Sequence, residues 1–150
     1  MYKKILVPLD GSALSEAVLD HVAAVATSCQ VPEVVLLRVT RPLDENIWEP
    51  IDTKVAPNLE KTYRIKATAY LEKIAVGLRA KGIDVKVEVL TGNPAEEIIK
   101  YSQRMGIDLI VMSTHGRSGF SRWVFGSVAD KVIRHTEVPV LIKPAGRRST

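Results

Sequence analysis

The chain has 150 residues, 46% hydrophobic and 25% charged, which is typical of a single globular domain. Its net charge of +4 is small, the basic residues are scattered and aromatic residues make up only 5%, a pattern that argues against nucleic-acid binding. No apolar run is long enough to cross a membrane and no leader pattern is present, so we expect a cytoplasmic protein without membrane contact. The single Cys29 excludes an intramolecular disulfide and is interpreted as a packing residue.

The N-terminal part of the chain alternates apolar runs with helical patterns. Residues 4–9 predict a strand that ends in the turn 10–12, where Ser12 is a candidate helix cap. Apolar residues at helical spacing predict one helix over 13–29, and the β-branched run 33–40 predicts a strand buried on both faces. The apolar face of that helix would consist of Leu14, Ala17, Val18, Val22 and Val25.

The middle of the chain contains a long loop, a helix and an edge strand. Residues 41–58 hold three prolines without either periodicity and predict a loop, in which Trp48 either covers a site or pins the loop to the body. A helix is expected over 59–81, with Gly82 as its stop. Apolar and charged residues alternate over 83–90, which indicates a strand with one wet face at the edge of a sheet.

The C-terminal part repeats the alternation of helix and strand. Asn93 and Pro94 predict the cap and first position of a helix. This helix would bury Ile98, Ile99 and Met105. The remaining elements are expected to be a strand over 108–112, a helix over 126–135, a strand over 138–143 and a disordered tail over 145–150, which leaves one domain over 1–144.

Strict alternation of strands and helices predicts the fold class: an α/β protein with a five-stranded parallel, flavodoxin-like or Rossmann-like sheet of order 3-2-1-4-5 and helices on both faces. In that order, the loops that follow strands one and four meet at the switch point, where ligands of such sheets bind. These loops are Pro8–Ser12 and Ser113–Ser127. The second loop is polar, contains glycines and leads into a helix N-terminus, so it is suited to an anion.

Several landmarks occur in one order along the chain: Lys4 to Ser12, the Gly92-Asn93-Pro94 turn, Met112 to Gly119, Gly126-Ser127-Val128 and Val138 to Ile142. With them, the chain from Tyr2 to Lys143 resembles the universal stress protein family. The nucleotide-binding branch of that family carries Gly-x-x-Gly, nine residues, then Gly-Ser or Gly-Thr. This chain has Ser113-Thr114-His115-Gly116, nine residues, then Gly126-Ser127, so only the first glycine is replaced.

The resemblance implies an adenine-nucleotide site for ATP or AMP, with or without Mg²⁺. It places Asp10 near the ribose or a metal, Val39 at the adenine through its backbone, and the phosphates on backbone N–H groups and the Ser127 hydroxyl. Ser113 would either weaken binding or supply a hydroxyl donor, and His115 would either touch the ligand or bond to the backbone. The assigned residues are Pro8, Leu9, Asp10, Val39, Met112, Ser113, His115, Gly116, Arg117, Gly126, Ser127 and Val128.

Three functions remain open from the sequence. The first is a dimeric, nucleotide-binding stress-response sensor or regulator, and the others are a slow ATPase or self-phosphorylating protein and a nucleotide-free interaction protein. Catalysis would need a positioned base, for which Asp10 and His115 are the candidates, but no nucleophile–base pair can be identified from spacing. By resemblance, and because the apolar strand Val138–Ile142 would leave an exposed sheet edge, we expect a homodimer.

Overall fold

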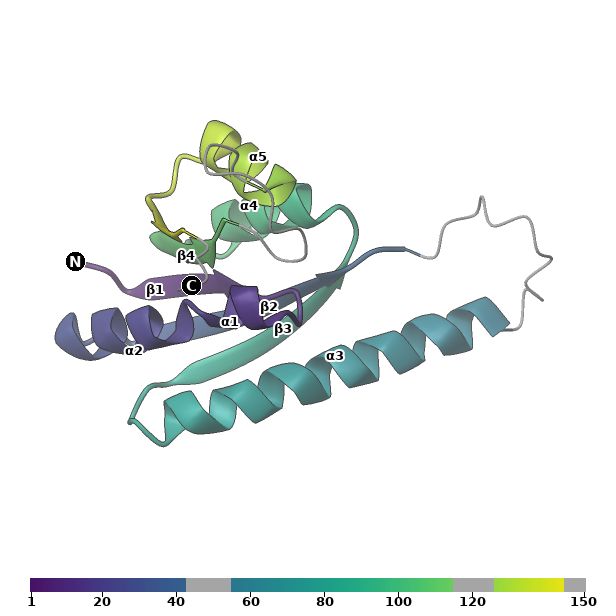
Figure 1. Cartoon of the computed structure of the whole chain (residues 1–150), viewed down its shortest axis with the longest axis horizontal. Helices are drawn as coiled ribbons and strands as arrows, with labels where there is room; N and C mark the ends of the chain where they lie inside the picture. The colour runs from purple at the N-terminus through teal and green to yellow at the C-terminus, as the bar shows by residue number, and fades with distance from the viewer. Residues whose placement is uncertain (43–54, 115–125, 145–150) are drawn as a thin grey trace, which may run out of the picture.

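The computed structural model describes residues 1–42, 55–114 and 126–144, without the side chains of residues 55–57. Within these ranges five strands form one parallel sheet of order β3-β2-β1-β4-β5 (Figure 1), which confirms the predicted class and strand order. The strands are β1 Lys4–Pro8, β2 Glu33–Thr40, β3 Val85–Thr91, β4 Leu109–Ser113 and β5 Val140–Lys143. β1 therefore lies at the centre of the sheet, between β2 and β4.

Helices cover both faces of the sheet (Figure 1). α2 and α3 pack on one face, α4 and α5 pack on the other, and the short α1 lies beyond the carboxyl end of β1. The helices are α1 Ala13–Glu16, α2 Leu19–Ser28, α3 Val55–Arg79, α4 Pro94–Arg104 and α5 Ser127–His135.

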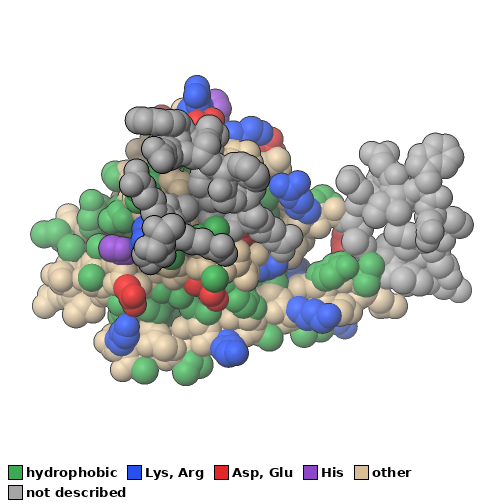
Figure 2. All heavy atoms as spheres, in the orientation of Figure 1, with side chains coloured by type: hydrophobic (Ala, Val, Ile, Leu, Met, Phe, Trp, Pro, Cys, Tyr) green, Lys and Arg blue, Asp and Glu red, His purple; other side chains and the backbone are tan. Residues whose placement is uncertain are grey.

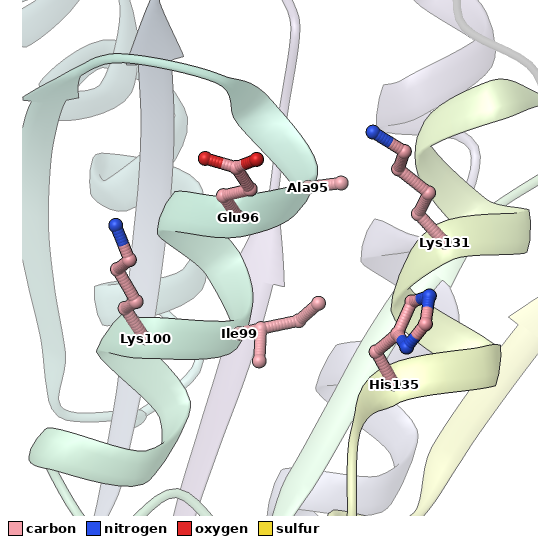
Figure 3. Close-up of a pocket in the computed structure, with 6 residues that line it drawn as sticks. All are labelled: Ala95, Glu96, Ile99, Lys100, Lys131 and His135. Carbon is pink, nitrogen blue, oxygen red and sulfur yellow. The ribbon is translucent and has the colours of Figure 1, made fainter.

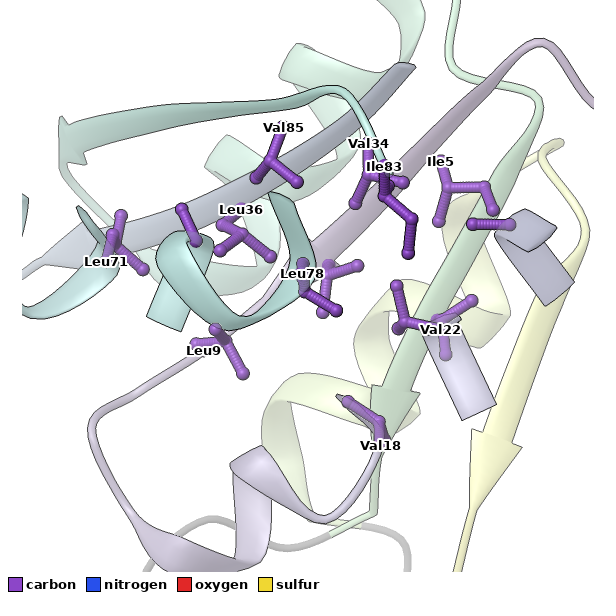
Figure 4. Close-up of a cluster of buried hydrophobic side chains, with 14 of the residues drawn as sticks. Ile5, Leu9, Val18, Val22, Val34, Leu36, Leu71, Leu78, Ile83 and Val85 are labelled. Carbon is purple, nitrogen blue, oxygen red and sulfur yellow. The ribbon is translucent and has the colours of Figure 1, made fainter. Parts of the chain in front are cut away.

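The hydrophobic core is divided into two clusters by the sheet. On one face, Leu71 and Leu78 of α3 and Val22 of α2 pack with strand residues such as Ile5 (Figure 4). On the other face, Leu6 lies in the cluster that α4 and α5 cover. Neighbouring residues of β1 point to opposite faces, and both faces are covered, so Ile5, Leu6 and Val7 are fully buried and anchor the half-buried carboxyl end of the strand.

β3 lies at the edge of the sheet, as predicted from its alternating sequence. Val85 and Val89 are buried, whereas Lys86 and Glu88 are exposed to solvent. Lys86 Nζ lies 3.1 Å from Glu33 Oε2 at the start of β2. The charged positions of this strand thus face water at the margin of the sheet.

The helix predicted over 13–29 is two helices in the structure. The chain turns at Ala17 and Val18, where the Ala17 N–H donates to the Leu14 carbonyl at 3.4 Å, a bond to the third residue back. This break shifts the helical phase, so Ser15 is buried and Ala17 is exposed, the reverse of the prediction. Ser12 does cap α1, since its Oγ accepts a hydrogen bond from the Ser15 N–H at 3.1 Å.

Two further expectations are corrected. α3 begins at Val55 and not at residue 59, so Pro57 belongs to its first turn. Proline is tolerated there because the N–H groups of a first turn have no acceptor within the helix. Met105 is 40% exposed because it is the C-cap of α4, beyond the last full turn, and Tyr101 and Ser102 are buried instead. The stop at Gly82 is confirmed, since its N–H donates to the Arg79 carbonyl at 2.9 Å with φ at +81°.

The surface seen in Figure 2 carries Lys and Arg side chains that are spread out among Asp and Glu. In the described part of the chain, no helix combines the length and the hydropathy that a membrane span requires. Cys29 is partly buried against the core at the end of α2, as expected of a packing residue.

Candidate functional site

The switch point of the sheet brings the ends of β1 and β4 side by side. Leu6 pairs with Ile110, and both strands run toward the same edge. Beyond β1, the Leu9 N–H donates to the Leu37 carbonyl at 2.9 Å and extends the ladder by one residue. Beyond β4, the Thr114 N–H donates to the Lys143 carbonyl at 3.2 Å. The segments that follow β1 and β4 therefore leave the sheet next to each other.

The β1–α1 turn is held by its own polar side chains. Asp10 is half-buried, and its Oδ1 accepts hydrogen bonds from the Ser12 N–H at 2.9 Å and the Ser12 hydroxyl at 2.5 Å. The buried Ser15 hydroxyl accepts from the Asp10 N–H at 3.3 Å and donates to the Ser12 carbonyl at 2.9 Å. The sequence Asp-Gly-Ser folds this way because aspartate and serine bond to backbone two or three residues further on.

The start of α5 lies close to the end of β4. The Gly126 N–H donates to the Thr114 carbonyl at 2.7 Å, although the two residues are twelve positions apart. Gly126 is the N-cap of α5, and no side chain in the described part of the chain caps this helix end. The first N–H groups of α5, from Ser127 onward, and the positive end of its dipole are thus presented at the switch point.

The structure places most of the residues assigned from the sequence at this edge. The backbone positions adjoin the ends of β1, β2 and β4 and the start of α5, except that His115, Gly116 and Arg117 lie outside the described residues. Leu9 and Met112 are only 3% and 5% exposed and belong to the core, so they support the edge more than they present surface to a ligand. The other described members are half-buried or exposed: Pro8, Asp10, Val39, Ser113, Gly126, Ser127 and Val128.

A group of side chains that the sequence did not reveal adjoins the β1–α1 turn. We call Glu16, Arg38 and Tyr70 the Tyr70 cluster. The guanidinium carbon of Arg38 lies 5.5 Å from the centre of the Tyr70 ring, and the Tyr70 hydroxyl donates to Glu16 Oε1 at 2.9 Å. Burial, followed by the bond to Glu16, raises the pKa of the Tyr70 phenol well above its ordinary value. The signal in the sequence is Arg38 itself, a cation that follows the buried apolar residues 34–37 of β2.

A hollow lies between α4 and α5 (Figure 3). It has a volume of about 280 Å³, with Ala95 and Ile99 of α4 facing Lys131 and His135 of α5. Glu96 and Lys100 complete its lining. None of the residues assigned from the sequence lines this hollow, and its polar side chains are exposed to solvent.

A parallel sheet of this order, covered by helices on both faces (Figure 1), defines a doubly wound α/β protein. Ligands of such sheets bind at the switch point, where the polar β1–α1 turn and the start of α5 lie here. Comparison with known proteins gives the family. The family model described as the universal stress protein family matches residues 1–144. The chain therefore belongs to the universal stress protein family.

Individual relatives agree with this assignment. Universal stress protein MJ0577 of Methanocaldococcus jannaschii is 34% identical over 95% of this chain and 94% of its own length. Its solved structure has a TM-score of 0.84 at 33% identity and covers 100% of this chain and 99% of that chain.

Two more distant structures share the fold and contain a nucleotide. A universal stress protein in complex with cAMP has a TM-score of 0.70 at 21% identity and covers 97% of this chain and 98% of that chain. A family protein from Arabidopsis thaliana with AMP bound has a TM-score of 0.66 at 19% identity, with 97% and 93% covered.

Proposed function

We propose that this stress-protein family member binds an adenine nucleotide, ATP or AMP, at the edge of the sheet between β1 and β4. The start of α5 carries the proposal: the Gly126 N–H donates to the Thr114 carbonyl at 2.7 Å and so holds beside the end of β4 a helix N-terminus that no side chain of the described residues caps. Backbone N–H groups and the helix dipole at such an end favour phosphate.

The remaining contacts of the proposed site follow from the neighbouring strand ends. Asp10, half-buried in an ordered turn, would face the ribose or a phosphate-bound Mg²⁺, and the Val39 backbone at the end of β2 would face the adenine. The described residues hold no group of three side chains suited to a metal ion. Mg²⁺ would therefore take most of its oxygen ligands from the nucleotide and from water.

The structurally similar proteins support this reading at the level of the fold. The cAMP complex and the AMP-bound Arabidopsis protein show that a sheet of this topology accommodates an adenine nucleotide. At 21% and 19% identity they do not transfer individual contacts to this chain. The assignment of residues here depends on the described geometry and on the Gly126-Ser127 motif.

The proposal includes a dimer in which the nucleotide acts as a signal. β5 is an edge strand, and each of its residues, Val140–Lys143, is only half-buried in the monomer. An apolar edge strand is a ready template for pairing, and a second copy of the chain would cover it. Sedimentation at micromolar concentration should give a particle of twice 16.5 kDa, whereas a monomer would contradict the dimer.

The test of nucleotide binding is calorimetric titration of ATP with Mg²⁺, and of AMP, into the protein and into Gly126→Asp. Gly126 has φ −52° and ψ 152°, a conformation open to any residue, and aspartate is a favoured N-cap, so α5 should remain folded. Two unit charges about 4 Å apart repel by about 4 kcal/mol at an effective dielectric constant of about 20. The affinity should therefore fall by at least about 100-fold.

A matched control exists at α4, the other helix on that face. Asn93→Asp introduces the same charge at the N-cap of α4, where Asn93 already accepts a hydrogen bond from the Glu96 N–H at 3.3 Å. Its nucleotide affinity should equal that of the unmodified protein. Absence of binding by the unmodified protein, or equal losses in both variants, would contradict the proposed site.

A further inference from the structure

The β1–α1 turn is supported from beneath by the side chain of Arg38. Gly11 has φ +88°, and a Cβ atom placed on it would lie 2.3 Å from Arg38 Nη1. The guanidinium therefore occupies the space that any side chain at position 11 would need. Asp10 and Ser12, on either side of Gly11, form the hydrogen-bonded turn of the proposed site.

Arg38 reaches this place because of the alternation along β2. Val39 packs toward the cluster covered by α4 and α5, so its neighbour Arg38 points to the face covered by α3. There the Tyr70 ring lies against the guanidinium, with 5.5 Å between the guanidinium carbon and the ring centre. An aromatic face attracts a cation and restricts its rotamers.

The same tyrosine also holds α1. Its hydroxyl donates to Glu16 Oε1 at 2.9 Å, and Glu16 follows directly after Ser15, whose hydroxyl accepts from the Asp10 N–H. One side chain in the middle of α3 is thus linked to the turn by two routes: through Arg38, which lies under Gly11, and through Glu16, the neighbour of Ser15.

We propose that Glu16, Arg38 and Tyr70 are positioning residues that couple the seating of α3 on the sheet to the nucleotide affinity of the β1–α1 turn. A shift of α3 moves the Tyr70 ring, and with it both supports of Asp10. Because coupling between two sites is reciprocal, nucleotide at Asp10 also stabilises α3 in its seated position. The effect on affinity rests on the proposed function, whereas the effect on the turn does not.

The variants that test the coupling are Tyr70→Phe, which keeps the ring under Arg38 and removes the bond to Glu16, and Arg38→Gln, which removes the guanidinium. Tyr63→Phe is the matched control, because Tyr63 lies two turns earlier on α3 and is 46% exposed. The first measurement is amide hydrogen exchange without nucleotide. The reporters are the N–H groups of Asp10, Ser12 and Ser15, each of which donates to a side chain of the turn.

Exchange of these three amides should accelerate about five-fold in Tyr70→Phe and in Arg38→Gln, with no change in Tyr63→Phe. The amide of Leu6 in the buried centre of β1 should be unaffected, which separates local loosening from global destabilisation. Unchanged exchange in the turn, or equal acceleration at Leu6, would overturn the positioning role whatever the nucleotide does.

The second measurement is nucleotide affinity and its effect on α3. Both cluster variants should bind AMP about five-fold more weakly, at the low end of typical couplings, and the control should bind normally. Nucleotide should slow the exchange of amides around Tyr70 in the unmodified protein and not in Tyr70→Phe. Equal affinities in all variants would overturn the coupling and leave the proposed function standing. A looser turn in a protein that binds no nucleotide would contradict the proposed function and the coupling to affinity, while the positioning of the turn would stand.

Discussion

Replacing Gly11 by alanine probes the turn that the proposed site depends on. Gly11 has φ +88°, and an alanine Cβ there would lie 2.3 Å from Arg38 Nη1 and 3.3 Å from Arg38 Cζ. A left-handed conformation costs a non-glycine residue about 1–2 kcal/mol, of which the stiffer unfolded chain offsets about 0.4–1 kcal/mol. The guanidinium is the end of a flexible side chain and moves aside, so the added cost is its contact with Tyr70, about 0.5–1 kcal/mol.

Gly82 separates the two contributions. It has φ +81°, close to that of Gly11, yet a Cβ atom at Gly82 would meet nothing within 4 Å. Gly82→Ala should therefore cost about 1 kcal/mol and Gly11→Ala about 2 kcal/mol of unfolding free energy. In a domain of this length these values correspond to losses of about 3 °C and about 6 °C in melting temperature.

The assay is thermal and urea unfolding of the two variants, each alone and in an Arg38→Ala background. If the excess cost at position 11 arises from Arg38, it should disappear in that background, with a coupling energy of about 1 kcal/mol. A Gly11→Ala cost no larger than that of Gly82→Ala would refute the reasoning. So would an excess that persists without Arg38.

Two further predictions concern stability. Asn93→Ala should cost about 1 kcal/mol in urea unfolding because the Glu96 N–H loses its cap, while Asn93→Asp should cost nothing; equal losses would contradict the capping role. Burial and the bond to Glu16 raise the pKa of Tyr70, so its contribution to stability is full below the unfolded pKa of about 10 and is lost as the pH rises through the folded pKa. Above about pH 10 the urea midpoint of the unmodified protein should therefore fall more steeply than that of Tyr70→Phe; parallel curves would show that the phenol is not protected.

Much of the fold could be predicted because local signals and topology agree. The buried run of β2, the alternation of Lys86 and Glu88 in β3 and the Asn93 cap each appear in the structure where the sequence indicates. The right-handed crossover rule leaves few strand orders for such a chain, and the flavodoxin-like order among them predicts the edge where a ligand should bind. That order places the polar turn at Asp10 on the same edge as the start of α5 at Gly126.

Other features depend on contacts between distant elements. No glycine or proline marks the break between α1 and α2. Ser15 of α1 instead bonds to Asp10 and Ser12 of the β1–α1 turn, a contact that helical periodicity does not reveal. Arg38 and Tyr70 are 32 positions apart, and only the packing of α3 on the sheet brings them together. Such pairs have no periodic signature in a single sequence.

The central claim is that nucleotide binds at the edge between β1 and β4, and amide chemical-shift mapping tests it most directly. On addition of AMP to ¹⁵N-labelled protein, we expect the largest shifts at Asp10, Val39, Ser127 and Val128. Binding in the hollow between α4 and α5, lined by Ile99 and His135, would give a distinct pattern of shifts. Largest shifts there, or no shifts at millimolar AMP, would contradict the proposed site.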